Sequence, residues 1–565
     1  MFNLRNSMKR DLTALSDTEF DLVIIGGGIY GAAATWDAAL RGLNVALIER
    51  NDFGGATSSN SLKIIHGGLR YIQQADVKRM RESIRERRIL MTIAPHLVHP
   101  MPCVMPLYGH LGKGPEVMRI AMLINDLVGF DRNRIDDPQK ILPNGGVISR
   151  QECLQILPGV KEDNLTGGAL WYDCHVHSSE RLLISYLRSA AEAGAQAANY
   201  IGAEKMLLKD NHVIGVEAKD RLTGERFRIR SKLVLNTSGP WVNETMNMIR
   251  NGTGEEEVKL SWAMNMVTRK LFDEYAAGVS GRIKIRENNR LVDKGSKVYF
   301  ITPWREYSLV GTVHRPYSGK PDEFAIKESF IHDFIRAVNE AIPGNPLKRE
   351  DVSFFYGGLL PMDRPNPKNG EVILTKHYKI KDHAQSDGIE GMISVIGVKY
   401  TTARDVGKKT VDYVLKKLGA AHKESETENK RVFGGSIDRF DEFKQKTMAE
   451  WKQRLPEAVL LQMAFNYGSE ISRVLKYGEE NPDYLKPISG TAVLPAEIIH
   501  AVREEMALHL TDALWRRTEL GSAGNPGDTV LQSVAEFMGK ELGWNKETIA
   551  AEVAAAKSIY VPAEG

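Results

Sequence analysis

Phe20-Asp21-Leu22-Val23-Ile24-Ile25 runs directly into Gly26-Gly27-Gly28-Ile29-Tyr30-Gly31 near the start of this 565-residue chain. The apolar run predicts a short buried strand, and the alanine-rich residues 32–42 predict a helix after the glycines. A second apolar run, residues 45–48, ends at Glu49, 18 residues after Gly31. This order is that of a βαβ unit with a GxGxxG turn and an acid at the tip of its second strand.

Each of these residue types has a physical role in such a turn. Gly26 allows the tight bend, and Gly28 lets backbone N–H groups at the helix N-terminus reach a pyrophosphate. Gly31 lets helix and strand pack closely, and Glu49 accepts hydrogen bonds from a ribose diol. The context therefore predicts a dinucleotide site, with a merely tight strand–helix turn as the alternative. The motif does not separate a flavin from a nicotinamide ligand.

The segment after Glu49 is rich in hydroxyl groups, glycine and cations. Ala56-Thr57-Ser58-Ser59-Asn60-Ser61 is followed by Lys63-Ile64-Ile65-His66-Gly67-Gly68-Leu69-Arg70-Tyr71. Small hydroxyl residues and glycines let the backbone lie flat against a large planar ligand and donate to its oxygens. This pattern, TSSxSxKxIHGGLRY, resembles that of the FAD-dependent glycerol-3-phosphate dehydrogenases and the related glycerophosphate oxidases.

Further segments resemble the same family, in order along the chain. They are Ala94-Pro95-His96-Leu97, NTSGPW at 236–241, ITPW at 301–304 with LVGT at 309–312, GVKYTTAR at 397–404 and DALWRRT at 512–518. The matches extend from residue 20 to about 520. They are specific for fold and cofactor, and less specific for the substrate.

The resemblance implies an α/β fold with three parts. A discontinuous FAD-binding, Rossmann-like domain of the glutathione-reductase and D-amino-acid-oxidase type is expected at residues 20–107, 175–257 and 385–420. An antiparallel-sheet substrate (cap) domain is expected at 108–174 and 258–384, and a helical C-terminal domain at 425–565. Local patterns agree, with alternation at 258–268, 298–301, 307–311 and 353–357, and helical spacing at 442–454, 456–466, 469–477, 496–508 and 529–542.

Composition limits the possible partners. The chain has 75 basic and 72 acidic residues, a net charge of +3, which argues against nucleic acid. The basic run Lys78, Arg79, Arg81, Arg85, Arg87 and Arg88 predicts a solvated helix face, with a contact to anionic lipid as the alternative. No stretch resembles a spanning helix or a secretory signal.

Neither the cysteines nor the spacing of potential metal ligands predicts a disulfide or a metal site. Three separated cysteines, Cys103, Cys153 and Cys174, suit a reducing cytosol. Alternation would place Asp173, His175 and His177 on one face of a strand, but the family uses an acidic stretch there without a metal. We therefore expect no metal.

The resemblance also implies site residues. His66, Arg70 and Lys399 are the expected catalytic residues, and Arg70, Tyr71, His314 and Lys399 are expected to contact the substrate. His66 is the candidate base, with an ordinary pKa near ~6.5, although it could simply pack on the flavin ring. Arg70 would hold the substrate anion, and Lys399 would stabilise a reduced flavin anion.

A larger set is expected to hold a non-covalent FAD through backbone and side-chain contacts. The set is Gly26, Gly28, Ile29, Tyr30, Gly31, Glu49, Arg50, Thr57, Ser58, Ser59, Lys63, Ile65, His66, Gly67, Gly68, Gly239, Trp241, Gly397, Lys399, Thr401 and Thr402.

Three segments depart from the family pattern. Trp262-Ala263-Met264-Asn265 stands where the family has K-G-x-H, and His314 ends a segment where the family has aspartate. Leu360 replaces a substrate-binding arginine, the loss of a charge-assisted bond worth about 2–3 kcal/mol. His314, Arg315 or Arg364 are candidates to supply the missing cation, and otherwise the substrate differs.

The leading hypothesis is therefore FAD-dependent oxidation of sn-glycerol 3-phosphate to dihydroxyacetone phosphate. Quinone is the expected acceptor because an insertion known in the oxidases is not seen, and this implies a cytoplasmic protein attached peripherally to the inner face of the cytoplasmic membrane. The alternatives are a flavoenzyme for another small hydroxy or amino compound, and a flavin-binding protein with impaired catalysis. The sequence does not decide whether the protein forms a homodimer.

Overall fold

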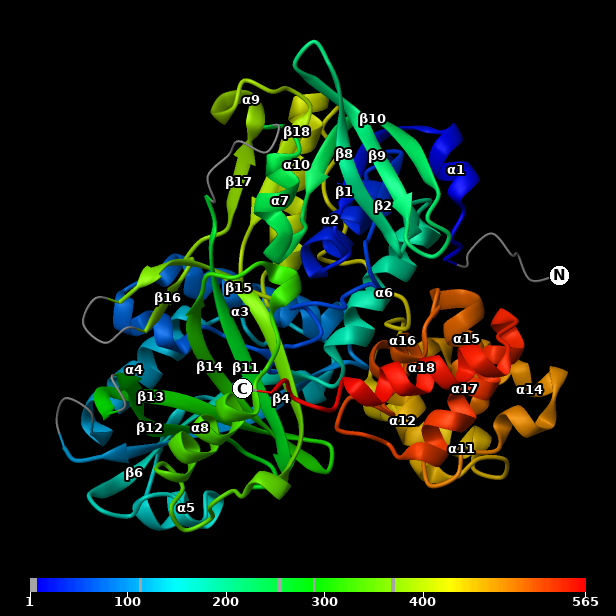
Figure 1. Cartoon of the computed structure of the whole chain (residues 1–565). Helices are drawn as coiled ribbons and strands as arrows, with labels where there is room; N and C mark the ends of the chain where they lie inside the picture. Colours follow the sequence, from blue (N-terminus) through cyan, green and yellow to red (C-terminus); the bar gives the residue numbers. More distant parts are fainter. Residues whose placement is uncertain (1–7, 111–113, 251–256, 288–289, 367–370, 565) are drawn as a thin grey trace.

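The computed structural model describes residues 8–110, 114–250, 257–287, 290–366 and 371–564. Its described strands form two sheets, one of eight strands and one of ten. Figure 1 shows the first sheet above the second, with the C-terminal helices to the right of the second sheet and below the first.

The first sheet is mainly parallel, in the order β17-β18-β10-β1-β2-β7. Its strands are β1 (Glu19–Ile25), β2 (Val45–Ile48), β7 (Gln196–Ala198), β10 (Arg226–Asn236), β17 (Lys379–Asp382) and β18 (Met392–Ile396), with β8 (Ile201–Lys209) and β9 (His212–Asp220) as a hairpin on β10. Helices α2 (Ile29–Leu40), α6 (Ser179–Glu192) and α10 (Ala403–Leu418) pack together against it. Strands buried on both faces need continuous apolar runs, which explains FDLVII and VALI.

This topology determines where the sequence motifs meet. Strands β2, β1, β10 and β18 are parallel neighbours, so their carboxyl ends share one edge. That edge carries Glu49, Gly26, Thr237 and Gly397 from four distant parts of the chain. Ligands bind at such an edge in doubly wound folds.

The second sheet is mostly antiparallel, in the order β16-β15-β11-β14-β13-β12-β4-β6-β3, with β5 on β6. Its strands are β3 (Ile64–Ile65), β4 (Val98–Tyr108), β5 (Gly146–Ile148), β6 (Leu165–Val176), β11 (Lys259–Arg269), β12 (Ala276–Glu287), β13 (Arg290–Trp304), β14 (Tyr307–Tyr317), β15 (Val352–Pro365) and β16 (Val372–Leu374). Helix α8 (Glu328–Asn339) covers one face, where Phe330 stacks on Trp262 at 4.5 Å.

The opposite face of the second sheet meets the first sheet's loops. A Cβ on Gly358 of β15 would lie 3.3 Å from Thr57 Cα, and Thr57 Oγ1 donates to the Leu359 carbonyl at 2.7 Å. The two sheets therefore enclose the loop 56–61 between them.

Three strands differ from the expected domain boundaries. Strands β3 and β4, which include residues expected in the first domain, pair with β6 in the second sheet. Strand β17, expected in the cap, pairs with β18 in the first sheet. All three lie where the chain crosses between the sheets, and the hydrophobic pattern alone does not indicate which sheet a strand joins.

The C-terminal region is helical, as predicted. It contains α11 (Phe440–Trp451), α12 (Glu457–Tyr467), α13 (Ile471–Leu475), α14 (Tyr477–Glu480), α15 (Pro495–Glu505), α16 (Leu510–Asp512), a π-helical turn (Ala513–Arg517), α17 (Asp528–Leu542) and α18 (Lys546–Ser558). The single helix expected at 469–477 is divided between α13 and α14. The remaining helices are α1 (Leu12–Asp17), α3 (Val77–Ile93), α4 (Pro115–Val128), α5 (Arg150–Ile156), α7 (Val242–Asn247) and α9 (His383–Ser386).

Candidate active site

The glycine turn has the geometry that the motif predicts. Gly26 has a φ of +106°, and a Cβ there would lie 2.6 Å from the Thr237 carbonyl oxygen. Gly28 is the N-cap of α2, and a Cβ there would have only Ser58 Oγ, at 3.2 Å, within 4 Å. The space before this helix N-terminus is therefore open, as a bound pyrophosphate requires.

Glu49 faces this turn. Its Oε2 accepts a hydrogen bond from Gly27 N–H at 2.7 Å, and its Oε1 accepts one from Asn51 N–H at 2.9 Å. Burial raises the pKa of the Glu49 carboxyl. The acid is fixed beside the glycines, where it can accept from a ribose.

The side chains of the hydroxyl-rich loop, residues 56–61, largely form hydrogen bonds within the protein. Ile29 N–H donates to Ser58 Oγ at 3.0 Å, and Ser59 Oγ donates to the Ala56 carbonyl at 3.2 Å. The Lys63 ammonium donates to both Glu180 carboxylate oxygens at 2.7 Å and is buried. This buried ion pair occupies the Lys63 side chain, which we expected to contact the cofactor.

His66 follows β3 at the junction of the two sheets. Its backbone N–H approaches Thr401 Oγ1 at 3.4 Å, which joins the two motifs HGGLRY and GVKYTTAR. Burial, together with Lys399 and other cations, lowers the pKa of His66 to about 4 despite the opposing charge of Asp173. The expected ordinary pKa near 6.5 is therefore corrected, and the imidazole is neutral at pH 7.

The side chains of Lys399 and Tyr71 contact each other. The Lys399 ammonium lies 4.5 Å from the centroid of the Tyr71 ring, and Arg79 lies 4.4 Å from it. Tyr30 Oη fixes the Lys399 backbone, since it donates to the carbonyl at 3.2 Å and accepts from the N–H at 3.1 Å. Burial lowers the pKa of Lys399 to about 8, and Arg79 adds to this.

Arg70 is exposed on the 3₁₀ turn Leu69–Gln74, and its charge reaches both His66 and His314. Within the described part of the chain, neither Arg70 nor Lys399 forms an ion pair with a carboxylate. Two cations without counter-ions beside a neutral histidine favour an anionic ligand.

The three segments that depart from the family pattern lie on strands β11, β14 and β15 of the second sheet. His314 pairs with Ala263, which pairs with Gly358, and Leu360 lies two residues further on the same face of β15. The Nδ1 atom of His314 is buried and has no hydrogen-bond partner among the described residues. Burial, with Lys297 and Arg70 nearby, lowers the pKa of His314 to about 3, so this side chain is a neutral donor and not a cation.

Asn265 and the two other candidate cations, Arg315 and Arg364, lie elsewhere on this sheet. Asn265 Nδ2 donates to the Asn60 carbonyl at 3.1 Å, and its Oδ1 accepts from Thr312 Oγ1 at 2.8 Å, which ties the sheet to the hydroxyl loop. Arg315 donates to the His314 carbonyl at 3.1 Å, and Arg364 is exposed at the β15–β16 edge.

The remaining predicted residues divide between the site and its rim. Gly239 has a φ of +57°, and a Cβ on Gly397 would lie 2.6 Å from Tyr30 Oη. Thr402 caps α10, and Ile65 is buried in β3. Arg50 instead pairs with Asp322 at 2.9 Å, and Trp241 Nε1 donates to the same carboxylate, so these two form a rim contact.

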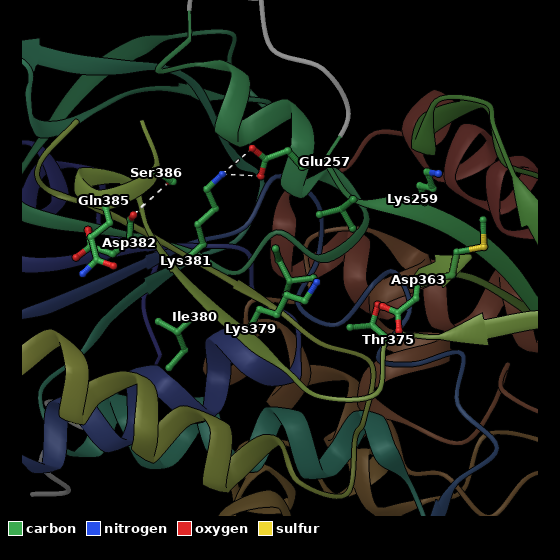
Figure 2. A pocket seen from close by; sticks show the side chains of 13 residues that line it. Glu257, Lys259, Asp363, Thr375, Lys379, Ile380, Lys381, Asp382, Gln385 and Ser386 are labelled. Atoms are coloured by element: carbon green, nitrogen blue, oxygen red, sulfur yellow. Dashed lines mark hydrogen bonds and ion pairs between the residues drawn. The ribbon is translucent and has the colours of Figure 1, made fainter. Parts of the chain in front are cut away.

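An open cavity of about 640 Å³ lies beside the site, between β17 and the strands β11 and β15 (Figure 2). Its lining includes three lysines and three acids: Lys259, Lys379, Lys381, Glu257, Asp363 and Asp382. Thr375 also lines the small cavity at Lys399, so the two adjoin. The balanced charge gives the large cavity no preference for anions.

Sequence reasoning missed two supporting residues. Arg79 stacks on Tyr71, and Asp173 accepts the Gly67 N–H at 2.5 Å. The sequence pattern around Asp173 suggests only a possible metal ligand. Asp173 is brought next to the HGGLRY segment by the pairing of β3 with β6, and the sequence alone does not indicate this pairing.

The five arginines of the basic run on α3 form ion pairs with carboxylates of this chain. Arg79 pairs with Asp76, Arg81 and Arg88 with Asp131, Arg85 with Glu428, and Arg87 with Asp173. In the portion of the chain that is described, no cluster of three His, Cys, Asp or Glu side chains is arranged for a metal, and no helix is long and apolar enough to cross a membrane.

Comparisons with known proteins agree with this geometry. The family model described as FAD dependent oxidoreductase matches residues 21–397, and the C-terminal domain of alpha-glycerophosphate oxidase matches residues 425–549. A glycerol-3-phosphate dehydrogenase of Synechocystis sp. is 31% identical over 95% of this chain and 96% of its own. The chain belongs to the family of FAD-dependent glycerol-3-phosphate dehydrogenases.

Other members of this family match over similar lengths. The aerobic glycerol-3-phosphate dehydrogenase of Staphylococcus epidermidis is 29% identical over 91% of this chain and 89% of its own. The solved glycerol-3-phosphate dehydrogenase of Bacillus halodurans, complexed with FAD, aligns with a TM-score of 0.74 over 97% and 95% of the two chains, at 23% identity. The predicted fold class and the FAD cofactor are confirmed, and the glycine turn fits that cofactor.

Proposed function

We propose that this flavoenzyme oxidises sn-glycerol 3-phosphate to dihydroxyacetone phosphate. The observation that carries the proposal is the convergence of neutral His66 with two cations, Arg70 and Lys399, beside the FAD-binding edge. A phosphate ester of a polyol offers the anion for the cations and the hydroxyl proton for the imidazole.

The protein groups have separate tasks in this reaction. Arg70 binds the phosphate through its planar fork, and Tyr71 borders the substrate. His66 accepts the hydroxyl proton as the C–H bond is oxidised. When bound, FAD would supply the hydride acceptor, and Lys399 is placed to stabilise negative charge on it.

Substrate binding also changes the pKa of His66. In the free protein the neighbouring cations disfavour the imidazolium. A bound phosphate dianion offsets their charge and raises the pKa of His66, because an opposite charge favours the charged form. The base is thus strengthened when the substrate is present.

Leu360 favours retaining a second candidate, a flavoenzyme for a less charged hydroxy or amino compound. The face that carries Leu360 offers the neutral His314 and no arginine side chain at that position. A flavin-binding protein with impaired catalysis is the third candidate, and it is opposed by the presence of His66, Arg70 and Lys399.

Anaerobic bleaching of the bound flavin separates these candidates. We expect glycerol 3-phosphate to reduce the flavin faster than glycerol, glycine or 2-hydroxy acids. Preferential reduction by an uncharged compound would replace the proposed substrate, and no reduction by any compound, with dithionite bleaching intact, would leave only flavin binding.

We further propose a membrane quinone as the electron acceptor, reached from a docked position on the inner face of the cytoplasmic membrane. Helix α4 supports this, since one of its faces is apolar and exposed: Ile120 61%, Leu123 62%, Leu127 66% and, just after the helix, Phe130 70%. Single exposed apolar residues are ordinary, but a contiguous patch marks an interaction site. In Figure 1, α4 lies at the edge of the molecule away from the C-terminal helices.

The charges around this patch favour anionic lipid as the occupant. Arg119 on α4 and Arg134 are exposed, and the Arg134 guanidinium lies 5.7 Å from the Phe130 ring centroid. An amphipathic helix with arginines at its border binds bilayers through apolar burial and attraction to anionic headgroups.

Co-sedimentation with phosphatidylglycerol vesicles tests this surface. The double substitution Leu123→Asp and Leu127→Asp should weaken binding about tenfold or more and slow quinone reduction, while turnover with a soluble dye stays unchanged. Leu222→Asp, at another exposed leucine (43% exposed), is the matched control. Undiminished vesicle binding in the double variant would contradict the assignment.

A further inference from the structure

Asp173 lies on β6 and is buried at 6% exposure directly behind the HGGLRY turn. Its Oδ1 accepts the Gly67 N–H at 2.5 Å and the Arg87 guanidinium at 2.8 Å. Its Oδ2 accepts the Trp171 indole N–H at 3.0 Å. Both oxygens are therefore engaged, and one holds the residue next to His66.

Arg87 completes the arrangement from α3. Its guanidinium also donates to the Tyr172 carbonyl at 2.6 Å. A Cβ on Gly67 would lie 2.5 Å from a guanidinium nitrogen of Arg87. The glycine at position 67 thus lets the Asp173–Arg87 pair press directly against the turn backbone.

The charges that face His66 come from four separate elements. Arg70 on the 3₁₀ turn, Arg87 on α3 and Lys399 after β18 all disfavour the imidazolium, and Asp173 on β6 favours it. Removing Asp173 or Arg87 should therefore move the protonation of His66 in opposite directions.

We propose that Asp173 is a positioning residue that holds the His66–Gly67 turn against the flavin and sets the proton affinity of His66. This rests on the proposed function, in which His66 takes the hydroxyl proton. Asp173 does so through Gly67 and through its charge, without touching the substrate.

Substitutions of Asp173 and Arg87 should shift the pKa of His66 in opposite directions, and the experiment measures this difference. In Arg87→Gln, the acid limb of kcat/KM for flavin reduction should move to higher pH by about one unit, because Asp173 loses its counter-charge. In Asp173→Asn, the limb should move to lower pH, and the rate of flavin reduction should fall about tenfold because the base is weaker.

Asp131→Asn is the matched control. Asp131 is a buried carboxylate paired with two arginines of α3, Arg81 and Arg88, and it lies outside the group of charges that face His66. This variant should lose thermal stability and keep the wild-type pH profile. A purely structural role for Asp173 predicts the same behaviour for all three variants, and that result would overturn the proposal.

A second measurement does not depend on catalysis. Diethyl pyrocarbonate modifies neutral imidazole, so the labelling of His66 in the flavin-free protein, followed by peptide mass spectrometry, reports its protonation. Labelling at pH 5 should be lower in Arg87→Gln than in wild type, and undiminished in Asp173→Asn. If glycerol 3-phosphate fails to reduce the flavin but these labelling shifts occur, the proposed function falls and Asp173 keeps its role. Equal labelling in both folded variants would refute that role.

Discussion

At the scale of single residues, burial changes what the side chains can do at neutral pH. Reference pKa values describe His66 and Lys399 as a partly charged and a fully charged group. In the structure, burial and like charges bring the pKa of His66 to about 4 and that of Lys399 to about 8. The imidazole is therefore an available base, and the ammonium is a cation that titrates within the working range of the enzyme.

The lowered pKa of Lys399 predicts an alkaline limb. The ammonium is present below pH 8 and lost above it, so anaerobic flavin reduction by substrate should decline above about pH 8. Lys399→Arg should move this limb beyond pH 10, because guanidinium keeps its proton. Lys399→Gln should abolish the limb and slow reduction at least about tenfold at pH 7. A limb that persists in Lys399→Gln would assign the titration to another group.

Leu360 gives a second prediction at this scale. If glycerol 3-phosphate is the substrate, Arg70 already binds its phosphate, and Leu360→Arg should change kcat/KM by no more than about threefold. Arg70→Ala should raise KM about a hundredfold, the loss of a charge-assisted fork of about 3 kcal/mol. A wild type that reacts poorly, together with a gain of orders of magnitude in Leu360→Arg, would show a pocket rebuilt for another substrate.

At the scale of elements, the glycine turn joins β1 to α2 through backbone geometry that side chains would prevent. Strands β1 and β2 begin and end within one residue of the predicted runs, whereas α2 begins three residues before, and ends two residues before, the predicted helix at 32–42. The prediction works here because the burial of a parallel strand and the steric demands of the turn are local properties of the sequence.

Replacement of Gly28 tests the role of this turn. Gly28→Val places a branched side chain in the open space before the α2 N-terminus, so the purified protein should carry little FAD. Absorbance at 450 nm relative to protein measures the occupancy. Gly146→Ala, where an added Cβ meets nothing within 4 Å, should keep full occupancy. A yellow, stoichiometric Gly28→Val protein would contradict the placement of the pyrophosphate.

At the scale of the whole molecule, buried charges join the C-terminal helices to the first sheet. Asp52, three residues after Glu49, accepts from Arg516 and from both terminal nitrogens of Arg517, at 2.8 and 2.7 Å for the latter. All three side chains are at least nine-tenths buried. The segment LWRR thus anchors the helical domain behind the cofactor edge.

Breaking this anchor should destabilise the protein strongly. Arg517→Met leaves Asp52 partly uncompensated in the interior, at a cost of about 3–5 kcal/mol, seen as a lower Tm in scanning calorimetry. Arg503→Met, which removes exposed pairs to Glu480 and Glu541, should cost about 1 kcal/mol or less. Equal losses in the two variants would contradict the anchoring role.

The pH dependence of this anchor has a definite sign. The two arginines hold the pKa of Asp52 well below its usual range. The stability that the pair contributes is therefore present above the ordinary carboxyl pKa of about 4 and is lost as the pH falls through the lowered value. The difference in Tm between wild type and Arg517→Met should accordingly remain constant from pH 8 to pH 5.

The sequence by itself determined the βαβ unit, the dinucleotide site and the helical C-terminal region, because each depends on local periodicity, glycine geometry or a short motif. Only the tertiary structure decided that β4 joins the second sheet, that Lys63 is used by Glu180, and that Asp173 lies behind His66. These contacts join residues that are distant in sequence, and their pairing depends on how the two sheets meet. The lowered pKa of His66 has the same origin, since the charges that act on it come from four elements that only the fold brings together.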